Sequence, residues 1–182
     1  MNFWKCYLTM MTECLFLKGR KMKNNLVWTN GKPLADDTYI EQTEKKLVII
    51  FPNSFKEIVR KYDGGMPNKP DFVCDYNGRK LIGSACQLGY MDSKEIRSIS
   101  SMANISGLII PSGVIPFAED GGGNRVCFDY RKNPDEPEIV YYYYYFYYDD
   151  PNSKNVFFVA NNFDEFLEML FDNDDGMPLS ER

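Results

Sequence analysis

The segment DGGGN at residues 120–124 has the glycine density of a loop that cradles phosphate. A P-loop, however, needs a Lys-Ser or Lys-Thr pair that opens a helix, and a dinucleotide-binding loop needs a further glycine where this chain has Val126. Residues 125–130 are instead typical of a strand. We therefore interpret the segment as a tight connection between two strands, because glycine and asparagine adopt positive φ at little cost.

Two pairs of adjacent acidic residues are the next candidates for chemistry: Glu119 with Asp120, and Asp149 with Asp150. Glycoside hydrolysis uses two carboxyl groups that converge on a cleft at a set separation, and adjacency in the sequence does not provide that arrangement. We expect these acids instead to be solvated in loops or to be presented to a basic partner.

Side chains that bind metals or act as nucleophiles are few. The absence of histidine excludes Ser/His/Asp and Cys/His catalysis and imidazole-ligated zinc. The five cysteines form no CxxC pair, which favours reduced and mostly buried thiols over disulfides or a zinc site. In the segment FDNDDG at residues 171–176, a calcium loop would place Phe171 and Arg182 at its two most important carboxylate positions. We predict no catalytic residues, no metal and no cofactor.

The run YYYYYFYY at residues 141–148 contains seven of the 13 tyrosines. Aromatic residues favour strands, and in a strand their side chains would occupy both faces. One face would enter the core. The other face either forms a row of tyrosines at the surface, where a large contact area and a hydroxyl group suit protein interfaces, or is covered by a helix of the same domain.

The elements that position these residues follow from hydrophobic periodicity and from capping residues. We predict four helices, which begin at Asp36 or Asp37, at Asn53, at Asp92 and at Asn161 or Asn162. They run to about Lys46, to Gly64-Gly65, to Met102 and through Leu170 respectively. Asp92 and Glu95 have the spacing of a capping box.

Strands are expected between and after these helices. Asn77-Gly78 is a strong signal for a two-residue hairpin turn between residues 71–76 and 79–83. Four further strands of one sheet are expected at residues 114–118, 125–131, 138–148 and 155–160. This order predicts one α+β domain with a mostly antiparallel or mixed sheet of about six strands and about four flanking helices.

We expect residues 22–174 to form this single domain and residues 175–182 to be a polar tail. Residues 1–21 lack the charge order of a signal peptide and the length of a membrane span, so we expect a cytoplasmic protein. Residues 18–21 can be encoded by purine-rich codons like those of a ribosome-binding site. We therefore interpret residues 1–21 as an upstream mis-start before Met22, with a disordered or amphipathic leader as the alternative.

Three stretches resemble those of a known family. They are FPNSFKEI at 51–58 with YDGGMP at 62–67, IPFAEDGGGN at 115–124 with CFDY at 127–130, and FDEFL at 163–167. Together they are similar to the SUKH superfamily, which is named partly for fungal cell-wall and killer-toxin-resistance members and consists mostly of bacterial immunity proteins. The resemblance extends over about residues 37–171.

The resemblance implies a non-catalytic domain that binds and neutralises a cognate bacterial toxin, typically a nuclease. An intracellular scaffold or regulatory module, related to the fungal members, is the alternative. Asp63 stands where the family usually has Asn, and we expect this change to matter little because both residues tolerate the turn at a helix end. The residues that we interpret as determinants of the fold are Pro52, Gly64, Gly65, Pro116, Phe117, Gly123 and Asp129.

The charge distribution indicates the kind of partner. Residues 1–112 contain 16 basic and 11 acidic side chains, whereas residues 113–182 contain five and 15. The acidic excess argues against direct binding of nucleic acid or of a membrane and suits a basic nuclease, which electrostatic attraction would steer to its inhibitor. The predicted toxin contacts are Glu119, Asp120, Asn124, Tyr143, Tyr145, Tyr147, Asp149 and Asp150.

Overall fold

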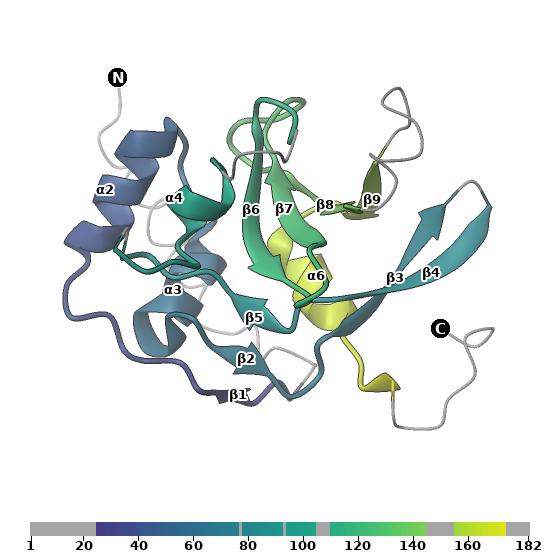
Figure 1. Cartoon of the computed structure of the whole chain (residues 1–182), viewed down its shortest axis with the longest axis horizontal. Coiled ribbons are helices and arrows are strands. Elements are labelled where there is room, and N and C mark those ends of the chain that lie inside the picture. The colour runs from purple at the N-terminus through teal and green to yellow at the C-terminus, as the bar shows by residue number, and fades with distance from the viewer. Residues whose placement is uncertain (1–24, 77, 93, 105–109, 145–154, 174–182) are drawn as a thin grey trace, which may run out of the picture.

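The centre of the fold is a five-stranded antiparallel sheet with the strand order β5-β6-β7-β8-β9. The computed structural model describes residues 25–76, 78–92, 94–104, 110–144 and 155–173 (Figure 1). The prediction that successive strands of the C-terminal half form one sheet is confirmed, because each strand from β6 to β9 pairs with the next. The sheet comprises β5 (Gln87–Leu88), β6 (Val114–Glu119), β7 (Arg125–Asp129), β8 (Glu138–Tyr142) and β9 (Val156–Ala160).

Side chains of the central strands alternate between two apolar clusters, since successive residues of a strand point to opposite faces. The main cluster includes Phe117, Phe128 and Tyr141. The second cluster, on the other face, contains Val114, Cys127, Val140 and Tyr142 as its buried residues. Every residue of β6 and β7 is buried, so both faces of these strands are withdrawn from solvent.

Four helices of the described region flank the sheet, which confirms the α+β class. In Figure 1, α2, α3 and α4 gather beside β5, while α6 packs against β8 and β9. The helices are α2 (Thr38–Leu47), α3 (Asn53–Tyr62), α4 (Ile99–Met102) and α6 (Phe163–Met169).

Aromatic rings join two of these helices to the sheet. Phe55 of α3 is fully buried. The centroid of its ring lies 5.6 Å from that of Phe117, 5.1 Å from that of Phe128 and 5.3 Å from that of Phe163 in α6. All three pairs are edge-to-face, the geometry that the ring quadrupoles favour.

The predicted hairpin is confirmed and projects from the body of the molecule (Figure 1). It consists of β3 (Asp71–Tyr76) and β4 (Arg79–Ser84), and Gly78 has the positive φ of 79° that the turn requires. Its base is anchored by the ring of Phe72, which packs edge-on against Tyr141 and Phe166. A second short ladder pairs β1 (Trp28–Thr29) with β2 (Met66–Pro67).

The helix predicted from Asp92 to Met102 is wrong in its first half. Only α4 is helical, and its N-cap is Ser98, whose Oγ accepts a hydrogen bond from the N–H of Ser101. Residues 92 and 94–97 are instead not helical, and backbone hydrogen bonds join the two ends of this segment: the N–H of Tyr90 donates to the carbonyl of Arg97, and the carbonyl of Tyr90 accepts from the N–H of Ile99. Asp92 therefore caps a local turn at Lys94 rather than a helix.

Two further boundaries differ from the prediction. The strand expected over residues 138–148 ends at Tyr142, and residues 145–148 lie outside the described region. Asn53 is not a cap but the first helical residue of α3, where Pro52 is the N-cap. Proline suits this position because it has no N–H to leave unsatisfied.

Asp63 ends α3 and buries its carboxyl group, with 6% of the residue exposed. Burial raises the pKa of Asp63 to about 6; the hydrogen bond that it accepts from the N–H of Met91 opposes this rise, and the charges of Asp92 and Glu95 add to it. The expectation that Asp in place of Asn matters little here considered only the backbone turn, whereas the structure buries the side chain. It stays a prediction, which the following variant tests.

Asp63→Asn should stabilise the protein at neutral pH. The native pKa is higher than the ordinary value of 3.8, so the native state binds the extra proton and the wild type loses stability as pH rises from about 4 through 6. The free energy of unfolding of Asp63→Asn minus that of the wild type should grow by about 2 to 3 kcal/mol over this interval. Urea unfolding at several pH values measures it, and a difference independent of pH would contradict the assignment.

Candidate functional site at the glycine-rich turn

The glycine-rich segment connects β6 to β7 and is organised by the carboxylate of Asp120. Its Oδ1 accepts hydrogen bonds from the N–H groups of Gly122 (2.7 Å) and Asn124 (3.2 Å). Its Oδ2 accepts from the side-chain amide of Asn124 and from the hydroxyl of Tyr141 (3.0 Å). Gly121 and Gly123 have φ of 79° and 104°, so the prediction of a tight strand connection is confirmed.

The turn is also bound to the end of β8. Asn124 is buried, and its Oδ1 accepts a hydrogen bond of 2.9 Å from the N–H of Tyr144. Burial, together with the negative charge of Asp120, raises the pKa of Tyr141 far above its usual value. Tyr141 therefore remains a hydroxyl donor to Asp120 at any physiological pH.

Glu119, the last residue of β6, lies in an ion-pair network in which its own side chain and that of Arg125 are buried, whereas 55% of the Arg97 side chain is exposed. Its carboxylate is 3.0 Å from Nε of Arg97 and 3.3 Å from Nη1 of Arg125. Arg97 also donates to Oε1 of Gln87 at 2.7 Å, and the amide of Gln87 donates to the carbonyl of Gly64. The expectation that Glu119 is a solvated loop acid is wrong, since the strand carries it into the fold and two arginines compensate for its burial.

A similar pair ends β7. Asp129 is buried and accepts two hydrogen bonds from the guanidinium of Arg131, at 2.8 Å and 2.6 Å. Burial alone would raise the pKa of Asp129, but the hydrogen bonds and charge of Arg131 outweigh it and hold the pKa below its usual range. The carboxylate of Asp129 is thus paired with Arg131 at the end of β7.

The other motif residues occupy internal positions. Phe117 is fully buried among aromatic rings, and Pro116 borders the irregularity in the pairing of β6 with β7. Gly64 has a φ of 68°, and a Cβ there would overlap the ring of Tyr90. A Cβ on Gly65 would lie 2.7 Å from the carbonyl oxygen of Tyr62, so neither glycine has room for a side chain.

The tyrosine run divides at the end of β8. Tyr141 and Tyr142 point to opposite faces, and both are buried, so these two form no exposed row. Tyr143 is half-buried, and its N–H donates to the carbonyl of Asn155 at 2.8 Å. The predicted contacts Tyr145, Tyr147, Asp149 and Asp150 lie outside the described residues.

The cysteines of the described region are free thiols. Cys74 and Cys127 are buried, as predicted, and Cys86 is half-buried. Burial raises the pKa of Cys74 to about 11, and it raises the pKa of Cys127 further, so neither is a thiolate nucleophile at neutral pH. The described residues contain no group of three or more Cys, Asp or Glu side chains that could hold a metal ion.

Within the part of the chain that the structure describes, no helix is long and apolar enough to span a membrane.

Sequence patterns did not reveal the partners of Glu119 and Asp120, which are Arg97, Arg125 and Tyr141. A buried carboxylate requires a cation or several hydrogen-bond donors. Placing β6 in the core therefore predicts that Glu119 has such partners. The identity of the donors depends on tertiary pairing, because Arg97 lies in a loop 22 residues before Glu119. Thus Glu119, Asp120 and Asn124 come together, but their polar groups point into the domain.

Glu119→Gln should destabilise the fold, because it leaves the buried guanidinium of Arg125 without its counter-charge. We expect a loss of about 3 kcal/mol in the free energy of unfolding, measured in urea. The matched control is Glu138→Gln, which breaks the pair of Glu138 with Lys132, whose side chain is 71% exposed; its cost should be below about 1 kcal/mol. Equal losses for the two variants would contradict the assigned role of Glu119.

Comparison with known sequences identifies the family of this chain. The model of the SUKH_6 family, described as SMI1-KNR4 cell-wall, matches residues 37–167. The match runs from the N-cap of α2 into α6 and includes the glycine-rich turn with both of its acids. No curated protein matches the chain. Because the family model covers well over half of the chain, the protein belongs to the SUKH_6 family of SUKH domains, a family that includes immunity proteins.

Proposed function

We propose that this protein is an immunity protein that binds a cognate bacterial toxin and blocks its basic, substrate-binding surface, and that the toxin is a nuclease. The observation that carries the proposal is the SUKH_6 match over residues 37–167. Binding without catalysis agrees with the site, since the acids of the glycine-rich turn are already paired within the domain. Glu119, Asp120 and Asn124 then serve the fold, together with the glycines and prolines of the motif.

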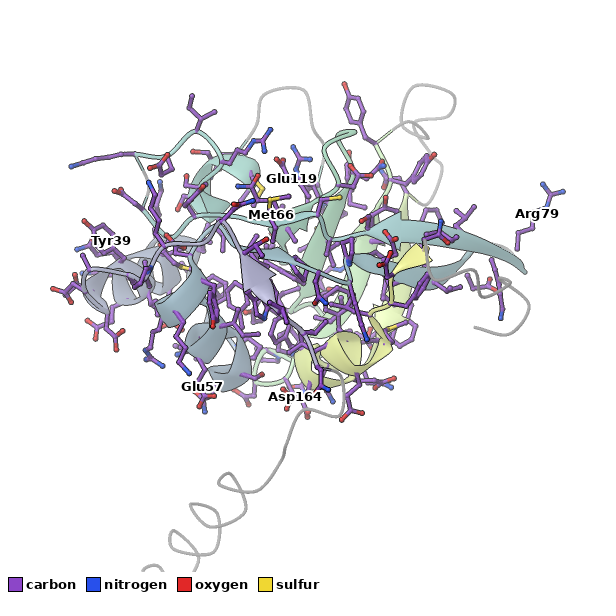
Figure 2. All side chains as sticks on the ribbon, turned by 90° about the horizontal axis from the view of Figure 1, so that it is seen from below. Tyr39, Glu57, Met66, Arg79, Glu119 and Asp164 are labelled. Atoms are coloured by element: carbon purple, nitrogen blue, oxygen red, sulfur yellow. The ribbon has the colours of Figure 1, made fainter. Side chains whose placement is uncertain are left out.

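The acidic residues that remain exposed supply the electrostatic part of the proposal. Asp135 and Glu136 are exposed in the loop after β7, and Asp164 is exposed on α6. The loop and the helix meet where the amide of Asn162 donates to Glu136. Figure 2 shows Asp164 on the same side of the molecule as Glu57 of α3, which is also exposed.

Such a face suits a nuclease, whose substrate-binding surface must be positive to hold phosphates. Opposite charges speed the encounter, and the docked inhibitor then excludes nucleic acid. The predicted contacts Tyr143, Tyr145, Tyr147, Asp149 and Asp150 remain part of the proposal.

The description of the matching family, SMI1-KNR4 cell-wall, favours a second candidate. In it the domain is a non-catalytic scaffold or regulatory module that binds a partner of cell-wall assembly inside the cell. The two functions differ in genetic context and in rescue: an immunity protein protects a cell from the toxin encoded beside it, and a scaffold does not.

Co-expression with the neighbouring toxin gene tests the proposal. Cells that express the toxin alone should stop growing, and cells that also express this protein should grow. The purified pair should co-elute in size-exclusion chromatography. Loss of growth despite co-expression, with no complex, would rule out immunity to that toxin.

The acidic face has its own test. The double variant Glu57→Gln/Asp164→Asn should bind the toxin about tenfold more weakly at low salt, with a shallower dependence of Kd on ionic strength. Glu95→Gln on the loop before α4 is a control that also removes exposed negative charge. If the double variant and the control bind like the wild type at every salt concentration, the proposed acidic face does not contact the toxin.

A further inference from the structure

Val48 occupies a position that neither its backbone nor its environment favours. As the C-cap of α2 it has φ of 57° and ψ of 48°, a left-handed conformation in which glycine is usual and a β-branched residue is a genuine outlier. Its side chain is 89% exposed, so burial does not compensate for the strain. A locally unfavourable choice of this kind is typical of a functional position.

Ile50, two residues later, is also an exposed β-branched residue, with 64% of the residue exposed. Val48 and Ile50 line a groove of about 590 Å³ together with Ile49, Tyr130 and Pro134. We call this surface the aliphatic groove. Two exposed β-branched side chains on one concave surface form an apolar patch, in contrast to single exposed residues such as Ile96.

Hydrogen bonds and an ion pair within the protein fix the backbone that forms the aliphatic groove. Oε1 of Glu44 lies 2.7 Å from Nζ of Lys56 and accepts a hydrogen bond of 2.8 Å from the N–H of Phe51. The hydroxyl of Tyr130 donates to the carbonyl of Ile50 at 3.0 Å. Binding here would therefore require little ordering of the loop, which favours affinity.

The charges at the rim of the aliphatic groove indicate which side chains a bound segment would carry. Glu41 and Asp135 line it with exposed carboxylates, Glu136 follows next to Asp135, and Lys45 is the one cation among the lining residues. We propose that the aliphatic groove docks a partner segment in which an aliphatic side chain stands next to Lys or Arg. The identification of that partner as the toxin rests on the proposed function; the groove itself does not.

Exchange of Val48 separates binding from folding. Asparagine tolerates the left-handed conformation, so Val48→Asn should leave the unfolding midpoint unchanged or higher. Combined with Ile50→Ser, it should weaken binding of the catalytically inactive neighbouring toxin by about tenfold or more. Ile96→Ser, which removes another exposed isoleucine, should change Kd less than twofold, about the spread of a single binding measurement. Unchanged binding by the folded double variant would overturn the proposal.

A second measurement does not depend on the toxin. Two synthetic peptides, one with alternating leucine and lysine and one with alternating leucine and glutamate, are titrated into protein with labelled valine and isoleucine methyl groups. The lysine peptide should shift the NMR signals of Val48 and Ile50, and the glutamate peptide should not. Equal responses to both peptides, or a change in sedimentation that shows a second copy in the groove, would overturn the proposal even if the toxin is neutralised.

Discussion

The buried carboxylate of Glu119 is the constraint on which much of this fold depends. It lies at the end of β6 between Arg97, from the loop before α4, and Arg125, the first residue of β7. Through Arg97 and Gln87 the same network reaches the carbonyl of Gly64, where α3 has just ended. One acid thus links the sheet, the loop and the helix end. Removing a partner from such a pair is costly because the remaining charge stays buried.

This arrangement separates the residues that build the domain from those available to a partner. The glycine-rich turn has the composition of a ligand loop, yet Asp120 and Asn124 use their polar atoms on each other, on Tyr141 and on Tyr144. A turn satisfied in this way provides a rigid end to the sheet. Among the described residues, the surfaces that we propose for recognition of a partner are the exposed acids and the aliphatic groove, which lies at the opposite end of α2 from its N-cap.

Much of the fold could be predicted from the sequence where the signal is local. The turn at Gly78 follows from positive φ, and the start of α6 follows from Asn162, whose Oδ1 accepts from the N–H of Glu165 at 2.9 Å. The prediction of a helix from Asp92 was wrong. Tyr90 forms backbone hydrogen bonds with Arg97 and Ile99, and hydrophobic periodicity cannot indicate tertiary bonds of this kind. The two-residue strands β1, β2 and β5 are too short to carry a pattern, which is why the described residues contain nine strands where six were expected.

The site was harder to predict than the fold. Adjacency of Glu119 and Asp120 indicated two exposed acids, whereas the end of β6 lies between them: Glu119 belongs to the strand and Asp120 to the turn. Val48 was hidden for a different reason. In the sequence it is one member of an apolar run, and only its left-handed backbone and the 89% exposure of its side chain distinguish it from Leu47 and Ile49, which are half-buried.

Titration of the purified protein into a nuclease assay of a candidate toxin tests the central claim, neutralisation by binding, most directly. The account predicts that activity falls in proportion to the inhibitor added and reaches zero near one molecule per toxin, at a rate limited by association. Full activity at a large excess of the protein would contradict the claim. So would complete inactivation at a small fraction of one equivalent, because that result requires turnover by an enzyme.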